Sequence, residues 1–248
     1  MITSFVDEGL GNSSYLVDLG DGGALAVDPV RDPTGYLAEA ERRNLTVRFS
    51  VETHLHADFI SGGRDLAALG AELVAPKGAG LAYTHRGVED AEELDVGGLT
   101  LRAIATPGHT PEHLSYLLLD GNRPLALFSG GAVIVGSIAR TDLVSPDLTD
   151  ALARQAYRAV RGRFAYLPDD LPVYPTHGGG SFCSVAASGE RTTTIGWERR
   201  SNPIFTVRDE DSFVTSFLGS LGSYPPYFLR TRALNQRGLP TGAHLRRI

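Results

Sequence analysis

The amino-acid sequence predicts an α+β domain in which helices cover sheets. In the first half, apolar strand-like runs at 47–51 and 71–75 are separated by a short helical pattern, so strand and helix alternate. In the second half, apolar runs at 99–105, 114–119 and 125–128 are joined by turns rich in Gly, Pro and Asn, which is typical of antiparallel strands. The length of 248 residues and the hydrophobic content of 42% fit one domain with a well-packed core.

Turn and cap residues predict the first elements. Apolar runs at 14–19 and 24–27 flank the turn Gly-Asp-Gly-Gly and predict a β-hairpin. Asp32 and Pro33 then supply the N-cap and the first-turn proline of a helix that reaches about Arg43.

Helices are expected toward the end of the chain. Apolar residues at helical spacing between 147 and 164 predict the best helix of the sequence, and Asp209 is expected to cap a last helix. Because the tail is basic and contains Gly and Pro, we expect a domain at 1–230 and a C-terminal surface extension at 231–248.

Charge and composition limit the classes of partner. The formal net charge is −6 and no long block of Lys and Arg occurs, so nucleic acid is not expected as a partner. The N-terminus lacks the pattern of a signal peptide, and no apolar run reaches the roughly 18 residues of a membrane span, so we expect a cytoplasmic protein without membrane contact. The single cysteine, Cys183, excludes an internal disulfide and a Cys-rich zinc site.

A His-x-His-x-Asp pattern follows the strand predicted at 47–51. His54, His56 and Asp58 alternate along an extended backbone, so their side chains point to one side. Neutral imidazole and carboxylate suit zinc, or iron(II) where two histidines and a carboxylate leave positions open. Taken alone, a His-x-His pair is more often a hydrogen-bonded polar loop.

Two further histidines stand at similar junctions between a strand and a loop. His109 follows the strand at 99–105 after a Thr-Pro-Gly turn, and His177 follows the strand-like residues 173–175. Such a recurrence is hard to explain by chance and favours a metal site. His113 is less favourable as a ligand, because the Pro and Gly of its turn disfavour the regular helix that an i, i+4 ligand pair needs.

Three motifs occur in order along nearly the whole chain: Thr-His-Leu-His-Ala-Asp at 53–58, Thr-Pro-Gly-His-Thr at 106–110 and Tyr-Pro-Thr-His-Gly at 174–178. They resemble those of the metallo-β-lactamase superfamily. The stretches 139–143, 177–183 and 194–203 look most like its persulfide dioxygenase (sulfur dioxygenase) branch, whose bacterial members are often fused to rhodanese domains. The resemblance implies a four-layer αββα sandwich with a metal site at one edge of its two sheets.

The chain departs from this family pattern at two positions. Phe59 stands where the superfamily usually has a histidine that serves a second metal, so we expect a mononuclear centre. Gly131 stands where the family has a metal-ligating aspartate, which in persulfide dioxygenases completes an iron site of two histidines and one carboxylate. Because the loss of a second-shell partner already costs about 10- to 100-fold in affinity or activity, this first-shell loss should cost at least as much.

The remaining residues still predict a site. His54, His56 and His109 are expected to hold one divalent metal ion, Fe(II) or Zn(II), with an open position for water. Asp58 is then expected to orient water or act as a base, and His177 to bind or polarise the substrate.

Three residues are candidates for substrate binding. Cys183 lies where the branch commonly has a cysteine near the active site, and is either a thiol that carries or senses sulfane sulfur or an inert buried cysteine. Arg199 and Arg200 either hold the carboxylates of a glutathione-like thiol or are ordinary surface charges. Asp142 would replace the missing ligand only if the chain before it folded back.

Three hypotheses about function follow. The first is a mononuclear, persulfide dioxygenase-like enzyme of sulfur metabolism that acts on a thiol persulfide such as glutathione persulfide. The second is a zinc-dependent hydrolase of a thioester or ester, like glyoxalase II, and the third is a metal-poor, non-catalytic binding protein that keeps the fold. The expected ligand is a small thiol or persulfide, while a homodimer and a rhodanese-type sulfurtransferase partner stay open.

Overall fold

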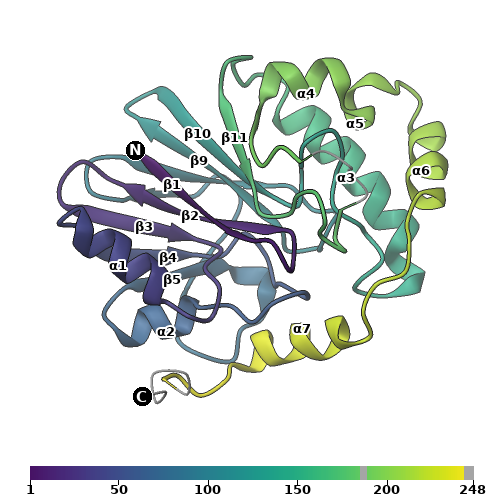
Figure 1. The fold of residues 1–248 in the computed structure, drawn as a ribbon. Coiled ribbons are helices and arrows are strands. Elements are labelled where there is room, and N and C mark those ends of the chain that lie inside the picture. Colours follow the sequence, from purple (N-terminus) through teal and green to yellow (C-terminus); the bar gives the residue numbers. More distant parts are fainter. Residues whose placement is uncertain (185–188, 243–248) are drawn as a thin grey trace.

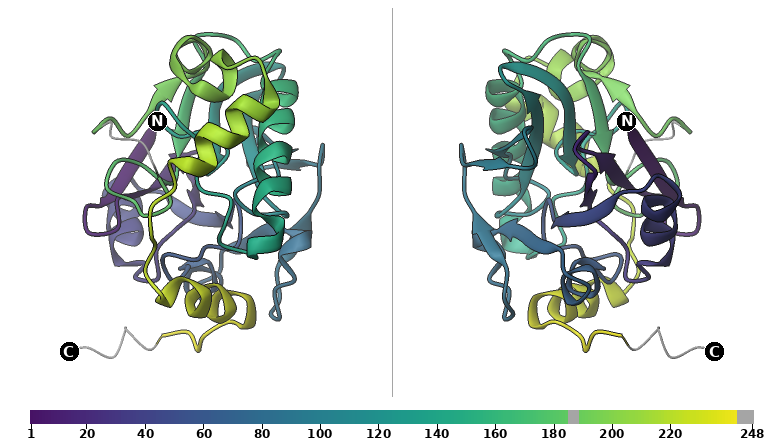
Figure 2. Two further views of the ribbon diagram at one scale, coloured as in Figure 1. Left: turned by 90° about the vertical axis from the view of Figure 1, so that its right-hand side faces the viewer. Right: turned by 90° about the vertical axis from the view of Figure 1, so that its left-hand side faces the viewer.

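The structure, a computed structural model, describes residues 1–184 and 189–242 and is a four-layer sandwich. Two six-stranded sheets pack face to face, and helices cover the outer face of each sheet (Figures 1 and 2). The αββα arrangement expected from the sequence is therefore confirmed.

The first sheet is mixed and has its strands in sequence order, β1 to β6. Its strands are β1 (Ile2–Asp7), β2 (Asn12–Asp18), β3 (Gly23–Val27), β4 (Thr46–Val51), β5 (Glu72–Pro76) and β6 (Arg86–Val88). The first three strands are antiparallel, including the predicted hairpin β2–β3, and β3 to β6 are parallel. Helices α1 (Thr34–Arg42) and α2 (Gly63–Ala68) cover this sheet, and the short helix η1 (Lys77–Ala79) follows β5.

The second sheet has the order β12-β11-β10-β9-β8-β7. Its strands are β7 (Glu93–Asp95), β8 (Thr100–Ala105), β9 (Leu114–Asp120), β10 (Arg123–Gly130), β11 (Pro172–Pro175) and β12 (Thr193–Thr194). The three runs predicted to pair antiparallel do so as β8, β9 and β10, whereas β11 is parallel to β10.

Helices from the second half of the chain pack on this sheet and around the edge of the sandwich. They are η2 (Pro146–Leu148), α3 (Thr149–Arg163), α4 (Ile195–Ser201), α5 (Pro203–Thr206), α6 (Glu210–Gly219) and α7 (Tyr227–Arg237). The Asp209 carboxylate accepts a hydrogen bond from Ser212 N at 2.8 Å, so the predicted cap of α6 is confirmed.

Side-chain alternation along the strands builds three hydrophobic layers. On β2, Leu16 packs toward α1 and α2, while Tyr15 and Val17 face the second sheet. On β9, Leu117 packs toward α3, while Leu118 faces the first sheet. The central strands β2, β3 and β9 are thus buried on both faces, which leaves the edges of the sandwich for polar side chains.

The loops that carry the histidine motifs leave the sheets at one edge. Strands β3 and β4 are parallel to each other, as are β10 and β11, so their carboxyl ends share an edge within each sheet. Asp28 follows β3, the histidine loop follows β4, Gly131 follows β10 and His177 follows β11. Clefts at the carboxyl ends of strands are common ligand sites in such sheets.

The expected boundary between 230 and 231 falls inside α7. This helix lies along the edge of the sandwich (Figure 1), and its Asn235 side chain is bonded to the histidine loop, so residues 231–237 pack as part of the domain. Of the extension expected at 231–248, residues 243–248 lie outside the described residues.

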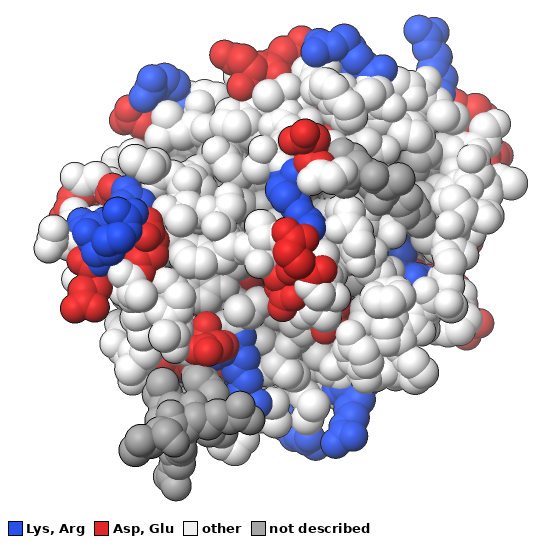
Figure 3. Space-filling model, viewed as in Figure 1, with Lys and Arg blue, Asp and Glu red and all other residues white. Residues whose placement is uncertain are grey.

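The surface agrees with the modest net charge of the sequence. Figure 3 shows acidic and basic side chains scattered over this face, without a large patch of one sign. Within the described residues, no helix is long and apolar enough to cross a membrane.

Candidate metal centre

Four imidazoles meet at the edge where these loops leave the sheets. His54 and His56 come from the loop after β4, His109 from the loop after β8 and His177 from the loop after β11; none is more than 3% exposed. The ring centroid of His54 lies 4.1 Å from that of His56 and 4.7 Å from that of His109. The ring centroids of His109 and His177 are 5.0 Å apart. The structure therefore brings the three predicted metal ligands and His177 together.

Hydrogen bonds determine which nitrogen of His54 carries the proton. Its Nδ1 lies 2.8 Å from Thr53 Oγ1, and the Thr53 hydroxyl donates to Asp28 Oδ2 at 2.7 Å. Because a hydroxyl has one proton, Thr53 Oγ1 must accept from Nδ1 of His54. The Nε2 atom then carries a lone pair, since burial and the neighbouring imidazoles hold the pKa of His54 well below its usual range.

The same reasoning applies to His177 and His109. His177 Nδ1 lies 3.1 Å from Asn12 Oδ1 and 3.3 Å from Asp58 Oδ2, both of which are acceptors because Asn12 Nδ2 donates to Asp58 Oδ2. His109 Nδ1 donates to the Arg140 carbonyl at 2.6 Å. In both imidazoles Nε2 is left to face the centre.

Two of these lone pairs face each other. The Nε2 atoms of His54 and His177 are 3.4 Å apart, and neither side supplies a proton in these tautomers. Such an arrangement is repulsive unless a cation lies between the nitrogens. The separation is close to the roughly 3.3 Å between two nitrogens bound to one tetrahedral zinc ion at about 2.0 Å.

His56 is held from behind by two carboxylates. Its Nε2 lies 3.1 Å from Asp28 Oδ1 and 3.1 Å from Glu52 Oε2, while Nδ1 has no hydrogen-bond partner in the described part of the chain. Although burial lowers the pKa of His56, Asp28 and Glu52 raise it to about 10. A metal bound at Nδ1 would displace this proton, and the carboxylates would orient the ligand as outer partners commonly do.

The donor set therefore fits a divalent metal, with one nitrogen of each imidazole fixed by the protein and the other directed inward. Ligand atoms of His54, His56 and His177 lie within 4.8 Å of one another, as do those of His109, His177 and Cys183. The exact set His54, His56 and His109 stays a prediction, because His177 takes part in both groups.

Asp28 organises this centre, and its role was not expected from the sequence. It is fully buried at a left-handed φ of 47° and accepts hydrogen bonds from Thr53 N at 2.7 Å, from the Thr53 hydroxyl and from the Thr176 hydroxyl. Backbone strain of this kind concentrates at functional sites. A carboxylate directly after an apolar strand, at the edge that carries the histidines, was the available signal. The roles of Glu52, Asn12 and Thr176 were not expected from the sequence either.

Gly131, which stands at the position of the family's aspartate, is hydrogen-bonded to His113 and packs against His109. The Gly131 amide donates to His113 Nε2 at 2.9 Å, and His113 Nδ1 pairs with Thr106 Oγ1 at 2.9 Å, so His113 has no free nitrogen for a metal. A Cβ at Gly131 would lie 2.7 Å from Cδ2 of His109 and 2.9 Å from Cβ of Ala139. The His109 imidazole thus occupies the space that an aspartate side chain would need.

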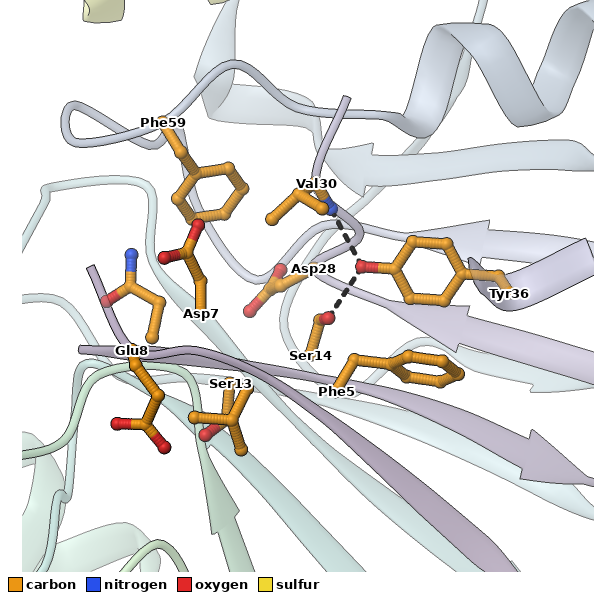
Figure 4. A pocket seen from close by; sticks show the side chains of 11 residues that line it. Phe5, Asp7, Glu8, Ser13, Ser14, Asp28, Val30, Tyr36 and Phe59 are labelled. Atoms are coloured by element: carbon orange, nitrogen blue, oxygen red, sulfur yellow. Dashed lines mark hydrogen bonds between the residues drawn. The ribbon is translucent and has the colours of Figure 1, made fainter. Parts of the chain in front are cut away.

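Phe59 covers the outer side of the histidines. Its ring stacks on His56 with centroids 4.3 Å apart, where a second-metal histidine was expected in the family pattern. Phe59 also lines a cavity of about 480 Å³, and Figure 4 shows its ring, Asp7 and Asp28 facing this space. Asp28 and Asn12 belong both to the cavity wall and to the hydrogen bonds of the centre, and the volume suits a small molecule.

Asp58 and Cys183 lie together beside His177. Although burial alone would raise it, the pKa of Asp58 is held well below its usual range by His177, and Oδ1 has no hydrogen-bond partner in the described residues. Cys183 is 1% exposed, and burial and the Asp58 carboxylate raise the pKa of its thiol well above the ordinary value. In the metal-free protein Cys183 is therefore a neutral, shielded thiol rather than a free nucleophile.

The two predicted substrate-binding arginines lie elsewhere. The Arg199 guanidinium donates to three carbonyls between α3 and β11 and pairs with Asp169, at the end of β11 opposite to His177. Arg200 is exposed on α4. Both carboxylate oxygens of Asp142 accept hydrogen bonds from the Arg140 guanidinium, at 2.6 and 2.8 Å. Asp142 therefore has a structural role and does not replace the missing metal ligand.

An αββα sandwich with buried imidazoles and carboxylates at one sheet edge defines a metalloenzyme fold of metal-dependent hydrolases and oxygenases. The sequence model of the metallo-β-lactamase superfamily matches residues 7–177, and the chain belongs to this superfamily.

Relatives of both chemical types are similar to this chain. Human mitochondrial persulfide dioxygenase ETHE1 is 29% identical over 191 residues, which span 76% of this chain and 68% of the relative. Cytoplasmic hydroxyacylglutathione hydrolase of Arabidopsis thaliana is 30% identical over 177 residues, which span 67% of this chain and 63% of the relative.

Two crystal structures extend the similarity to nearly the whole chain. A metallo-β-lactamase from Staphylococcus aureus is 32% identical with a TM-score of 0.89, covering 97% of this chain and 73% of that one. ETHE1 from Myxococcus xanthus is 28% identical with a TM-score of 0.81, covering 95% and 98% of the two chains.

Proposed function

We propose that this protein is a mononuclear metalloenzyme that oxidises a small thiol persulfide such as glutathione persulfide. The observation that carries the proposal is the set of four buried imidazoles that meet at one sheet edge, with ligand atoms of His54, His56 and His177 within 4.8 Å of one another. The similarity to persulfide dioxygenases over most of the chain supports this substrate class.

The chain's own residues provide binding and orientation. An iron(II) ion at the centre would supply the site that binds oxygen and the persulfide sulfur. Asp28 and Glu52 orient His56, and Thr53 orients His54. Asp58, an ionised carboxylate beside His177, is placed to orient a thiol or water by accepting a hydrogen bond from it, and the cavity lined by Asn12, Asp28 and Phe59 offers space for the rest of the thiol.

Oxygen consumption tests this proposal. The protein is reconstituted anaerobically with iron(II), and oxygen uptake is followed after glutathione persulfide is added. We expect turnover that is lost in His109→Ala, because this variant removes an imidazole of the centre. An iron-loaded preparation that consumes no oxygen would contradict the proposal.

A zinc-dependent thioester hydrolase is the second candidate. It is favoured by the neutral histidines, which leave a bound zinc ion more positive than a site with a carboxylate would, and by the hydroxyacylglutathione hydrolase relative. Zinc-loaded protein should then cleave an S-acylglutathione without oxygen, and His109→Ala should not. Absence of both activities in metal-loaded protein would favour a non-catalytic binding protein.

A further inference from the structure

We propose that Cys183 is a metal ligand, and that its thiolate acts with His109 and His177 in place of the carboxylate that Gly131 lacks. The Cys183 sulfur and one nitrogen of each histidine lie within 4.8 Å of one another, and all three residues are buried. This inference rests on the proposal that the protein holds a divalent metal, and it names the residues that do so.

The three atoms are close enough to share one ion. With bonds of about 2.0 Å to nitrogen and 2.3 Å to sulfur, the ligand atoms of a tetrahedral site are roughly 3.3 to 3.7 Å apart. Side-chain movements on the order of 1 Å would therefore close the observed group around a metal. His54 lies next to the group, because its Nε2 is 3.4 Å from that of His177.

The backbone of one residue, Arg140, is hydrogen-bonded to both Cys183 and His109. Arg140 N donates to the Cys183 carbonyl at 2.9 Å, and the Arg140 carbonyl accepts from His109 Nδ1 at 2.6 Å. The Arg140 guanidinium also donates to the Phe182 carbonyl at 3.0 Å. The cysteine loop is thus tied to the histidine across the position where the family's aspartate would stand.

An unpartnered carboxylate oxygen gives an independent sign of a ligand. Asp58 is 4% exposed, and its Oδ1 has no hydrogen-bond partner in the described residues, although Oδ2 is bonded to Asn12 and lies beside His177. Burying such an atom without a partner is unfavourable. A cation held by Cys183 and His177 would offset this cost.

Charge explains why a cysteine is suited to this place. The histidines supply only neutral donors and Gly131 supplies none, so without Cys183 the charge of a divalent ion would be balanced only from outside the ligand set, by Asp28, Glu52 and Asp58. A thiolate removes one unit of that charge, as the aspartate does in the family pattern. Catalytic zinc sites with cysteine and histidine ligands keep one position open for water or substrate.

Cobalt substitution tests this ligand directly, because Cys183 is the only cysteine of the chain. Freshly reduced, metal-free protein is titrated anaerobically with cobalt(II) and followed by absorption spectroscopy. Any thiolate-to-cobalt charge-transfer band in the near ultraviolet must then come from Cys183. We expect this band in the parent protein, none in Cys183→Ser, and a cobalt affinity at least about 10-fold lower in that variant.

Two further variants compare buried imidazoles of the same centre. His177→Ala should lose the sulfur band, because His177 shares the ligand group with Cys183. His56→Ala should keep it, because His56 belongs to the other group. Circular dichroism and thermal unfolding of each variant show whether it is folded.

The outcomes separate this inference from the proposed function. Visible d–d bands of bound cobalt without a sulfur band in the parent protein would overturn the role of Cys183, and so would an absence of cobalt binding. A sulfur band in a protein whose iron and zinc forms turn over neither persulfide nor thioester would support the ligand and contradict the proposed function.

Discussion

Single residues decide how the histidines of this protein can act. Whether an imidazole can bind metal depends on the partner of its other nitrogen, and here the partners are Thr53, Arg140 and the Asn12–Asp58 pair. His113 has the same side chain, but both of its nitrogens are hydrogen-bonded, one to Gly131 N and the other to Thr106 Oγ1. Residue type alone does not distinguish these cases.

Gly131→Asp should not restore the family's site. The new Cβ would lie 2.7 Å from the His109 ring, so we expect His109 to be displaced, with a loss of about 1 to 3 kcal/mol in the free energy of unfolding and weaker metal binding. Chemical denaturation and metal titration measure the two effects. Gly131→Ala is the control, because it adds the Cβ without a carboxylate; tighter metal binding by Gly131→Asp alone would show that the carboxylate is accommodated.

Helix α7 is an element whose role in the centre follows from its contacts. Asn235 is buried and donates to the carbonyls of His56 and Phe59, both at 2.8 Å, while its Oδ1 accepts from Ser61 N at 3.0 Å. One side chain thus holds three backbone groups of the histidine loop.

Asn235→Ala should therefore destabilise the histidine loop, although residue 235 is far from this loop in the sequence. Three backbone groups lose their partner, so we expect a loss of about 2 kcal/mol in unfolding free energy and weaker metal binding. Denaturation and metal titration of this variant are compared with Arg237→Ala, an exposed position on the same helix. Equal behaviour of the two variants would show that α7 does not position the loop.

The short helix α4 offers a second comparison at this scale. Arg199 donates to three carbonyls after α3, whereas its neighbour Arg200 is exposed. We expect Arg199→Ala to lower the unfolding free energy by about 1 to 3 kcal/mol and Arg200→Ala to leave it nearly unchanged. Neither change should alter the binding of glutathione, measured by calorimetry. Weaker glutathione binding in either variant would support the role in substrate binding expected from the sequence.

For the whole molecule, the buried histidines predict a stability maximum near neutral pH without metal. Burial lowers the pKa of His113 to about 3 from its ordinary value of 6.5, and His54 and His109 are lowered too. Below pH 6.5 the unfolded chain therefore binds more protons than the folded one, and stability falls toward pH 3.

His56 acts in the opposite direction. Its folded-state pKa of about 10 lies above the ordinary value of 6.5, so its contribution is complete below pH 6.5 and is lost as pH rises through 10. Thermal unfolding of chelator-treated protein between about pH 4 and pH 10 should show a maximum at about pH 6 to 7. A melting temperature that still rises above pH 7 would show that His56 is not held as an imidazolium.

Much of the fold could be predicted from local patterns. The hairpin β2–β3, the antiparallel strands β8 to β10, and helices α3 and α6 follow from turns, caps and apolar periodicity. β1, which is only partly buried, and α7, which carries three arginines and has a weak apolar stripe, give weak local signals and were not predicted. Their place is set by contacts with distant strands and loops.

By itself, the sequence determined most of the strands and helices and the four histidines at the ends of strands, because both depend on residues close together in the chain, whereas the four layers of the sandwich were implied by the resemblance to the superfamily. Only the tertiary structure decided which nitrogens face the centre, that Asp28 and Glu52 hold His56, and that Cys183 reaches His109 and His177. These features depend on hydrogen bonds between residues far apart in sequence, such as those of Asn12 to Asp58 and Thr176 to Asp28. The physical reason is that proton positions and ligand distances are set by the surrounding donors and acceptors, which meet only when both sheets are packed.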